Sequence, residues 1–347
     1  MKRMLLVICT TALLFGMTGP GCVGEGELLG AGATFPQPLY SKMFDAYYKQ
    51  LKVRINYQGI GSGAGIEQLK NKTVDFGATD SFMTDEDLSN APALIVHIPI
   101  TLGAVVVTYN LPSNPQIRLS RDVLADIFLG VITQWNDEAI VALNPGVDLP
   151  KIPITIVHRS DGSGTTAIFT EYLSKISADW RAGVGAGKEV KWPAGLGAKG
   201  NPGVAGQIKQ LPGSVGYVEL IYALENEMPI AELENKKGSF ITPSLESTEL
   251  SAEVAVPDDT RVSLTDTDAE RGYPITGLTW VIVYREQNYD GKSRDRAKRL
   301  VDLLWWMTHG GQEYCEPLKY APIPADILDK AEAVIKSITY DGAPLLN

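Results

Sequence analysis

Strand-like and helix-like patterns alternate along almost the whole chain, and this alternation limits the possible fold more than any other feature of the sequence. A helical pattern, with apolar residues three and four positions apart, runs from Pro36 to Tyr47, and the strand-like stretch VRINYQ follows it. Further on, LIVHIPITLGAVVVTYN predicts two strands, YPITGLTWVIVYRE predicts a strand, and AKRLVDLLWWMTHGGQEY predicts a helix. Chains of this kind form α/β folds with parallel or mixed sheets covered by helices.

The chain is long enough for two domains. It has 347 residues, and a domain holds about 150 residues. From the patterns alone, the chain crosses into a second region around 104–111. In that region LSRDVLADIFLG and ITQWNDEAIVAL predict helices, IPITIVHRS predicts a strand, and GTTAIFTEYLSKI predicts another helix. A glycine-rich tract over 183–206 predicts a loop.

The first residues read as an export signal. Lys2 and Arg3 precede the apolar run Met4–Phe15, which is shorter than the roughly 18 residues that a membrane-spanning helix needs. We therefore predict that residues 1–22 are a signal peptide. The mature protein is expected in the periplasm or elsewhere in the cell envelope.

Cys22 raises the question of a lipid anchor. A lipid-bearing cysteine usually has a leucine-like residue three positions earlier, whereas Gly19–Gly21 precede this one. We still favour lipidation of Cys22, because the other cysteines are Cys9, inside the signal, and Cys315. One lone cysteine in the body of an exported protein makes no disulfide framework, but a Cys22–Cys315 bridge stays open as an alternative.

The composition is acidic, which argues against some classes of partner. The chain has 31 Lys and Arg against 41 Asp and Glu, a net charge of −10, and removing Lys2 and Arg3 with the signal leaves 29 against 41, or −12. Nucleic acid and anionic membrane surfaces select basic patches, so neither is an expected partner. A small anion is not excluded, because an enclosed site responds to its nearest dipoles more than to distant charges.

Three glycine-rich segments lead into predicted helices: GAGATF over 30–35, GIGSGAG over 59–65 and SDGSGTT over 160–166. A helix N-terminus carries unpaired N–H groups and a partial positive charge, so it suits an oxyanion. Glycine lets the backbone approach a ligand, and Ser and Thr add hydroxyl donors or cap the helix. One such segment is explained by caps and turns, but three together favour a small-anion site.

Charged side chains beside these segments extend that prediction. Arg159 lies two residues before Asp161, so the carboxylate can orient the guanidinium, whose planar fork binds a tetrahedral oxyanion through two hydrogen bonds. A surface ion pair is the alternative. Asp80 ends VDFGATD and can be a helix cap, or it can accept a hydrogen bond from a ligand that carries a proton. It would repel a ligand that carries none.

Enzyme motifs mostly fail. A nucleophile elbow needs a glycine two positions before the serine, but Asp161 precedes Ser163 there and Ile60 precedes Ser62. The GKS at 291–293 lacks the first glycine of a P-loop. We therefore predict no catalytic residue.

Neither a metal site nor a dinucleotide site is predicted. The three histidines, His97, His158 and His309, lack the spacing of metal ligands. The GIGSGA of 59–64 fits a relaxed dinucleotide fingerprint, but that motif is unspecific and an exported protein rarely meets NAD. We expect no metal and no cofactor.

Seven stretches of the chain carry a resemblance: GAGATFPQPLY, NYQGIGSGAGIEQL, TVDFGATD, WNDEAIVALNPG, HRSDGSGTTAIFTEYL, VKWPAGLGAKGNPGVAG and LPGSVGYVE. In this order they resemble the PstS family, the periplasmic phosphate-binding proteins of the high-affinity phosphate ABC transporter. The resemblance implies a two-domain periplasmic-binding-protein clamshell, type II-like, in which each domain is a mixed sheet flanked by helices. It implies domain I over 25–103 plus 276–347 and domain II over 104–275.

The resemblance also implies which residues bind phosphate. They are Thr34, Phe35 (through its backbone), Ser62, Asp80, Arg159, Ser163, Gly164 and Thr165. Asp161 would orient the arginine. Two departures from the family pattern, Gly63 in place of a common second serine and His158 in place of a frequent basic residue, remove none of these groups.

The function that the resemblance implies is capture of inorganic phosphate and its delivery to the membrane subunits of an ABC importer, by a monomer without a cofactor. Phosphate near neutral pH still carries a proton, because the second pKa of a phosphate monoester is about 6 and free phosphate behaves similarly. Asp80 would accept that proton's hydrogen bond and reject sulfate, which has no proton to offer. A phosphate sensor or scavenger, and a phosphatase-like protein that shares the cleft, remain alternatives.

Overall fold

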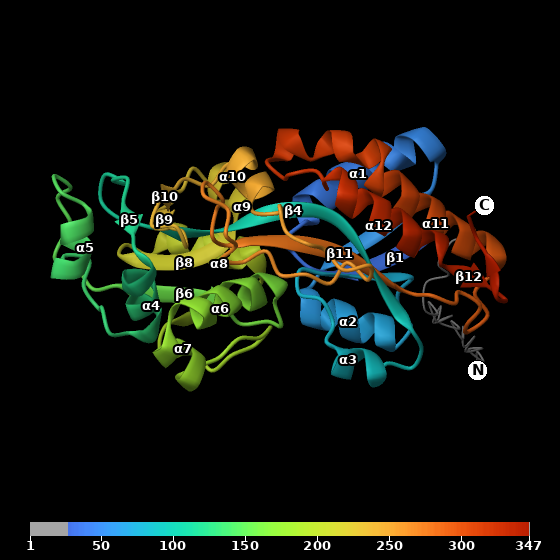
Figure 1. Ribbon diagram of the computed structural model, residues 1–347, viewed down its shortest axis with the longest axis horizontal. Coiled ribbons are helices and arrows are strands. Elements are labelled where there is room, and N and C mark those ends of the chain that lie inside the picture. The colour runs from blue at the N-terminus through green and yellow to red at the C-terminus, as the bar shows by residue number, and fades with distance from the viewer. Residues whose placement is uncertain (1–26, 347) are drawn as a thin grey trace, which may run out of the picture.

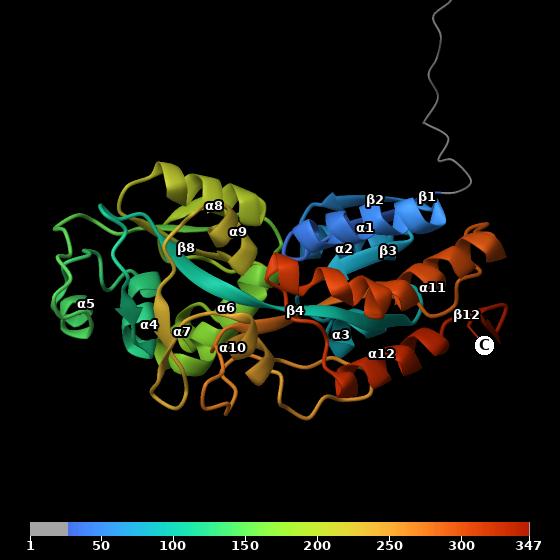
Figure 2. The ribbon, with the colours of Figure 1, turned by 90° about the horizontal axis from the view of Figure 1, so that it is seen from above.

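The protein has two lobes joined by long strands (Figures 1 and 2). The structure, a computed structural model, describes residues 27–346. The predicted signal peptide, Cys22 and its predicted lipid therefore lie outside the described residues. Within the described part of the chain, no helix has both the length and the apolar character that crossing a membrane requires.

The first lobe contains the N-terminal and C-terminal parts of the described chain. Its strands are β1 (Glu27–Gly32), β2 (Arg54–Gly59), β3 (Phe76–Thr79), β11 (Thr276–Tyr284) and the first part of β4 (Ile95–Tyr109), with the short pair β12 (Thr339–Tyr340) and β13 (Ala343–Pro344). Its helices are α1 (Gln37–Leu51), α2 (Ser62–Lys70), α3 (Asp85–Ser89), α11 (Arg294–Thr308) and α12 (Ala325–Lys336), with the 3-10 turns η1 (Gly310–Tyr314) and η2 (Glu316–Leu318).

The second lobe contains the middle of the chain. Its strands are the last part of β4, β5 (Arg118–Leu119), β6 (Thr155–Arg159), β7 (Leu196–Ala198), β8 (Ser214–Glu219), β9 (Glu232–Glu234) and β10 (Phe240–Ile241). Its helices are α4 (Arg121–Leu129), α5 (Glu138–Leu143), α6 (Gly164–Ile176), α7 (Ala178–Gly183), α8 (Gly200–Gln210), α9 (Leu220–Glu225) and α10 (Leu245–Leu250).

A single eight-stranded sheet runs through both lobes in the order β2-β1-β3-β11-β4-β8-β6-β7. β1 pairs in parallel with β2 and β3, and β6 pairs in parallel with β7 and β8, whereas β4 is antiparallel to β8 and β11. Each lobe therefore has a mixed sheet with helices around it, which confirms the predicted α/β, two-domain fold class.

β4 joins the lobes by changing its partner. Its residues up to Ala104 pair with β11, and those from Val105 onward pair with β8. The stretch predicted as two strands is therefore one strand, and that prediction was wrong. Gly103 lies within this strand, and a Cβ at this position would lie 2.6 Å from the ring of Phe35. Every residue of β11 and nearly every residue of β4 is buried, so these strands form the core of the junction.

The exact domain bounds stay a prediction. The change of partner in β4 falls next to the predicted bound at 103/104. Near 258–261, however, the chain lies against the first lobe, since Thr260 donates a hydrogen bond to the His97 carbonyl and accepts one from the Trp280 indole.

The predicted loop over 183–206 is partly ordered into regular structure. β7 lies within it, and α8 begins at Gly200, where the backbone φ of 70° makes the turn into the helix. The first helix agrees with its prediction, because Leu39, Met43 and Tyr47 all lie on the buried face of α1. The Cys315 thiol is buried.

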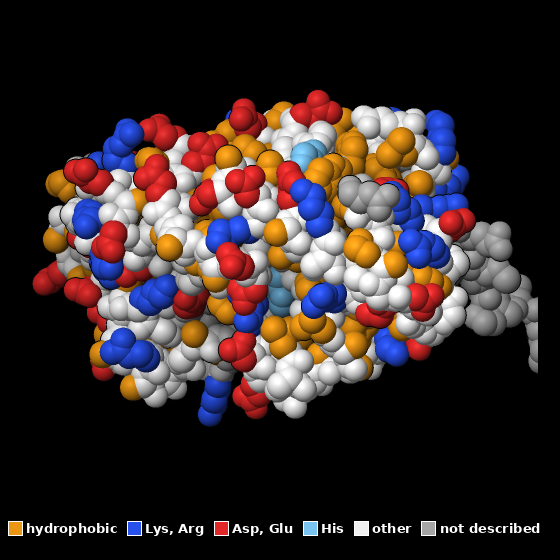
Figure 3. Space-filling model, turned by 45° about the vertical axis from the view of Figure 1, so that its right-hand side comes forward, with side chains coloured by type: hydrophobic (Ala, Val, Ile, Leu, Met, Phe, Trp, Pro, Cys, Tyr) orange, Lys and Arg blue, Asp and Glu red, His pale blue; other side chains and the backbone are white. Residues whose placement is uncertain are grey.

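The surface carries both signs of charge. Figure 3 shows acidic and basic side chains mixed over one face of the molecule rather than gathered by sign.

Candidate functional site

The three glycine-rich segments meet at the junction between the lobes. In the first lobe, the 30–35 segment begins within the last residues of β1 and the 59–65 segment begins at the last residue of β2, while in the second lobe the 160–166 segment follows β6. The Gly63 N–H donates to the Gly162 carbonyl at 2.9 Å, and the Gly164 N–H donates to Ser62 Oγ at 3.0 Å. In Figure 1 α2 and α6, which begin at two of these segments, lie on facing sides of the junction. Segments separated by about a hundred residues thus form one site.

Asp80 is the acidic group at the centre of this site. It follows β3, is 3% exposed, and accepts a 2.8 Å hydrogen bond from Thr279 Oγ1. Ser62 lies beside it, with 3.4 Å between Ser62 Oγ and Asp80 Oδ2. Burial raises the pKa of Asp80 to about 7, and Thr279, Arg159 and Ser62 oppose that rise. The carboxyl can therefore hold or release a proton near neutral pH.

Arg159, at the end of β6, supplies the positive charge. Its side chain is buried, and Nε and Nη2 donate to the two carboxylate oxygens of Asp161 at 2.8 and 2.6 Å. Burial by itself would raise the pKa of Asp161, but the hydrogen bonds and charge of Arg159 lower it below its usual value. The backbone N–H of Gly200 also donates to Asp161, at 2.9 Å. The predicted role of Asp161, to orient the guanidinium, requires a bidentate contact of this kind.

The N-terminus of α6 lies against the first lobe. Ser163 is the N-cap of the helix and accepts a 3.0 Å hydrogen bond from the Thr166 N–H. Gly164 lies directly against the facing lobe, since a Cβ there would lie 2.7 Å from Asp80. Only glycine allows this approach. Thr165 is fully buried, and its hydroxyl accepts a weak 3.4 Å contact from Arg159 Nη1.

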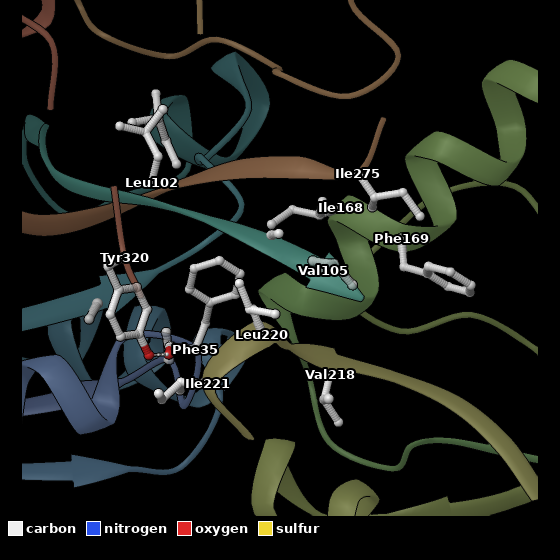
Figure 4. Packing of buried hydrophobic residues seen from close by; sticks show 14 of the residues in the cluster. Phe35, Leu102, Val105, Ile168, Phe169, Val218, Leu220, Ile221, Ile275 and Tyr320 are labelled. Carbon is white, nitrogen blue, oxygen red and sulfur yellow. Dashed lines mark hydrogen bonds between the residues drawn. The ribbon is translucent and has the colours of Figure 1, made fainter. Parts of the chain in front are cut away.

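Thr34 completes the set from the first lobe. Its hydroxyl accepts hydrogen bonds from the backbone N–H and side-chain amide of Asn201, at 3.1 and 3.0 Å. The same amide donates to Thr165 Oγ1 at 3.1 Å. The residue after Thr34, Phe35, turns its ring into the core, where Leu220, Ile221 and Tyr320 surround it (Figure 4).

All the predicted anion contacts therefore come from one buried region. Thr34, Ser62, Asp80, Arg159, Ser163 and Thr165 are each at most 4% exposed. The set consists of hydroxyls, backbone N–H groups, one arginine already paired with an aspartate, and one aspartate of variable charge. Such a set presents donors to an anion and carries little net charge of its own.

The departures from the family pattern are accommodated. A Cβ at Gly63 would lie 3.2 Å from the Gly162 Cα, so a larger residue would have to shift the facing loop. His158 stacks on Trp192, with ring centroids 4.8 Å apart. Neither residue displaces a predicted contact.

Comparison with known proteins gives the family. A family model described as a PBP superfamily domain matches residues 23–305. The phosphate-binding protein PstS of Pasteurella multocida is 41% identical over 89% of this chain and 90% of its own, and that of Haemophilus influenzae is 42% identical over 90% and 93%. This chain belongs to the PstS family. The relatives bear the names of binding proteins, not of enzymes.

Solved structures agree with the PstS fold. The phosphate-binding protein of Stenotrophomonas maltophilia is similar with a TM-score of 0.69 at 20% identity, over 88% of this chain and 93% of its own. A putative phosphate ABC transporter substrate-binding protein from Clostridium perfringens, solved with bound phosphate, has a TM-score of 0.63 at 16% identity, over 86% and 100%. At such identities the likeness concerns the fold alone.

The sequence did not predict two polar residues of this buried cluster. Asn201 bridges Thr34 and Thr165, and Thr279, on β11, holds Asp80. Asn201 lies within the quoted stretch VKWPAGLGAKGNPGVAG, just after a glycine and before a proline, which is a helix-start signal that could have pointed to it. Thr279 lies in a continuous apolar strand pattern, where no local signal marks it.

No metal site accompanies these residues. Within 27–346, no group of three or more His, Cys, Asp or Glu side chains is placed to hold a metal ion.

Proposed function

We propose that this PstS family member captures inorganic phosphate between its lobes and delivers it to the membrane subunits of an ABC importer in the cell envelope. We also propose that it acts as an exported monomer. The proposal rests on one observation: both lobes present hydrogen-bond donors around a buried acceptor, Asp80. The names of the relatives supply the ligand, since they are phosphate-binding proteins.

The proposed binding residues are those predicted from the resemblance, with Asn201 added. Thr34, Ser62, Ser163 and Thr165 would donate through hydroxyls, and the backbone of Phe35 and of Gly164, at the α6 N-terminus, would add N–H groups. Arg159, held by Asp161, would bind two phosphate oxygens. Because the Arg159–Asp161 pair is neutral overall, the acidic net charge of the chain does not oppose binding in this dry site.

Asp80 would supply the choice among anions. With a pKa near 7 it titrates in the same range as the second ionisation of phosphate, which is near 6 in a monoester, so one proton can be shared between the carboxyl and the phosphate oxygen. Sulfate brings no proton, and an ionised Asp80 would face it with a bare charge. Arsenate has the shape and protonation chemistry of phosphate, so Asp80 should not exclude it.

An enzymatic reading lacks support in the geometry. Ser163 acts as a helix cap, and among residues 27–346 no hydrogen bond joins its side chain to a histidine. The Gly61 turn, which fits the relaxed dinucleotide fingerprint, packs against the facing loop, since a Cβ there would lie 2.5 Å from Asp161. Little room is left for a dinucleotide at that turn.

Calorimetric titration of the mature chain with phosphate, arsenate and sulfate tests the proposal. We expect tight binding of phosphate with one site per chain, binding of arsenate, and sulfate affinity lower by at least about 100-fold at pH 8. Equal affinity for phosphate and sulfate would overturn it. Release of phosphate from a chromogenic ester by the purified protein would favour an enzyme instead.

A further inference from the structure

A buried acid that the proposed anion contacts do not use lies behind the Thr34–Phe35 segment. Glu219, the last residue of β8, has no exposed surface and pairs with Val105 at the point where β4 enters the second lobe. Its Oε2 accepts a 2.9 Å hydrogen bond from the Ile221 N–H at the start of α9. Within the described residues, its Oε1 has no hydrogen-bond partner.

Two tyrosine hydroxyls hold the backbone of the same Thr34–Phe35 segment. Tyr222, on α9, donates to the Thr34 carbonyl at 2.5 Å. Tyr320, between η2 and α12, donates to the Phe35 carbonyl at 2.7 Å, the contact drawn as a dashed line in Figure 4. The orientation of a main proposed donor segment therefore depends on these two side chains.

The protons around Tyr320 can be counted. Its oxygen lies 2.7 Å from the Phe35 carbonyl oxygen and 3.2 Å from Glu219 Oε2. A phenol has one proton, and a carbonyl oxygen can only accept. If the phenol proton goes to Phe35, the second contact is a hydrogen bond only when Glu219 supplies a proton of its own. An ionised Glu219 would instead draw the phenol proton away from Phe35.

The surroundings favour the proton-bearing form of Glu219. Burial is the largest cause that raises its pKa well above the usual value; hydrogen bonds from the Ile221 N–H and Tyr320 oppose the rise, and the charge of Asp80 adds to it. The other titratable groups that face it are Tyr222 and Tyr320, which are neutral donors. Arg159 is engaged by its own aspartate partner. A Cβ on Gly103 of β4 would lie 3.3 Å from Glu219 Oε1, and the Asn201 amide oxygen accepts from the Glu219 backbone N–H.

We propose that Glu219 is a positioning residue of the anion site: its carboxyl group bears a proton that it donates to the Tyr320 hydroxyl oxygen, so that Tyr320 keeps its own proton on the Phe35 carbonyl. The proton stays on the acid, and no bond to the ligand is involved. This inference rests on the proposed function only for its affinity readout. The protonation itself is a property of the free protein.

Two variants and a matched control test the inference. Glu219→Gln removes the acid proton and keeps a neutral side chain, but no single amide atom can both accept from the Ile221 N–H and donate to Tyr320, as a protonated Oε2 can. Tyr320→Phe removes the hydroxyl that holds Phe35. Glu225→Gln makes the same chemical change on an exposed residue of α9. Infrared spectra of the free proteins at pH 8.5, where Asp80 is almost fully ionised, show whether another carboxylic acid stays protonated, and phosphate titrations measure the affinity.

We expect wild type and Glu225→Gln to show a buried carboxylic-acid band that Glu219→Gln loses. We expect Tyr320→Phe and Glu219→Ala to bind phosphate about tenfold more weakly, because a buried carbonyl loses its donor or that donor loses its support. Glu219→Gln should fall between wild type and Glu219→Ala, since its amide can make only one of the two contacts of Oε2. The spectra of Glu219→Gln decide the matter even if Glu219→Ala does not fold.

Two results would overturn the inference: an infrared spectrum unchanged by Glu219→Gln, or a phosphate affinity in Glu219→Ala and Tyr320→Phe equal to that of wild type. Wild type that binds no phosphate would defeat the proposed function instead. In that case the acid band would still decide whether Glu219 carries a proton.

Discussion

Replacing Asp80 by asparagine tests how this site would tell phosphate from sulfate. Sulfate is the cleaner probe of the carboxyl, because it does not titrate near neutral pH while phosphate does. With the pKa of Asp80 near 7, the carboxyl is about 90% protonated at pH 6 and about 3% protonated at pH 8.5. If only the protonated form tolerates sulfate, wild-type sulfate affinity should fall by about 30-fold between these pH values.

The variant should remove this pH dependence and reduce the selectivity. In Asp80→Asn, sulfate affinity should stay flat from pH 6 to 8.5, since the amide has no charge and can donate. Phosphate should lose a charge-assisted hydrogen bond, about 1.5–3 kcal/mol. Together the two changes should lower the preference for phosphate over sulfate by more than about 100-fold at pH 8.5.

Calorimetry at pH 6, 7 and 8.5 measures both ligands, with Asp148→Asn as the control, because Asp148 is an exposed aspartate of the second lobe. Wild-type sulfate affinity that does not change with pH would refute the ionisation of Asp80 as the cause of selectivity. An Asp80→Asn protein that still rejects sulfate would show that the rejection comes from elsewhere in the site.

The raised pKa also has a consequence for stability. The usual pKa of an aspartate is 3.8, and in the folded protein that of Asp80 is about 7, so between these values the native state binds more protons than the unfolded state. The stability of the ligand-free protein should therefore fall as pH rises through this window. Asp80→Asn should lack this component of the fall in thermal unfolding scans, and an identical pH dependence in the two proteins would contradict the assignment.

Three further predictions follow from individual contacts. Arg159→Lys keeps the charge but loses the bidentate hydrogen bonding to Asp161, so phosphate affinity measured by calorimetry should fall by at least about tenfold. An affinity equal to wild type would mean that the bidentate contact is not needed. Asn201→Ala removes the amide that donates to both Thr34 and Thr165, and phosphate binding should weaken by about 1–3 kcal/mol. Unchanged affinity would show that these two hydrogen bonds do not contribute to binding. Asp75→Asn leaves the buried Lys292 without its ion-pair partner, 3.2 Å away, and chemical denaturation at pH 7 should show a loss of about 3–5 kcal/mol. Burial by itself would raise the pKa of Asp75, but its cationic partners lower it below 3.8, so its stabilisation is present above that pH and is lost on acidification. A stability difference between this variant and wild type that persists undiminished at pH 2 would contradict that reasoning.

Local patterns predicted much of the secondary structure. The buried face of α1 follows directly from apolar residues three and four apart. The glycine-rich segments were placed correctly before α2 and α6, because glycine, serine and threonine are the residues that begin helices after tight turns. These features depend on neighbours within a few positions, so they can be read from the sequence.

The single strand β4 shows where prediction from local sequence patterns fails. The stretch LIVHIPITLGAVVVTYN was predicted as two strands. The backbone stays extended throughout, because β11 pairs with one part of it and β8 with the other. Those partners are far away along the chain. Thr279 was missed for a similar reason, since only the neighbouring strand shows that its hydroxyl meets Asp80.

The sequence by itself determined the α/β class, the family resemblance and the residue types that could surround an anion, because these are recorded in local spacing and in short motifs. The tertiary structure decided which groups meet and in what charge state. Asp80 has a pKa near 7 and Glu219 has a pKa well above its usual value because residues from distant parts of the chain exclude water around both carboxyls. Desolvation depends on the whole packed environment, and no stretch of the sequence contains it.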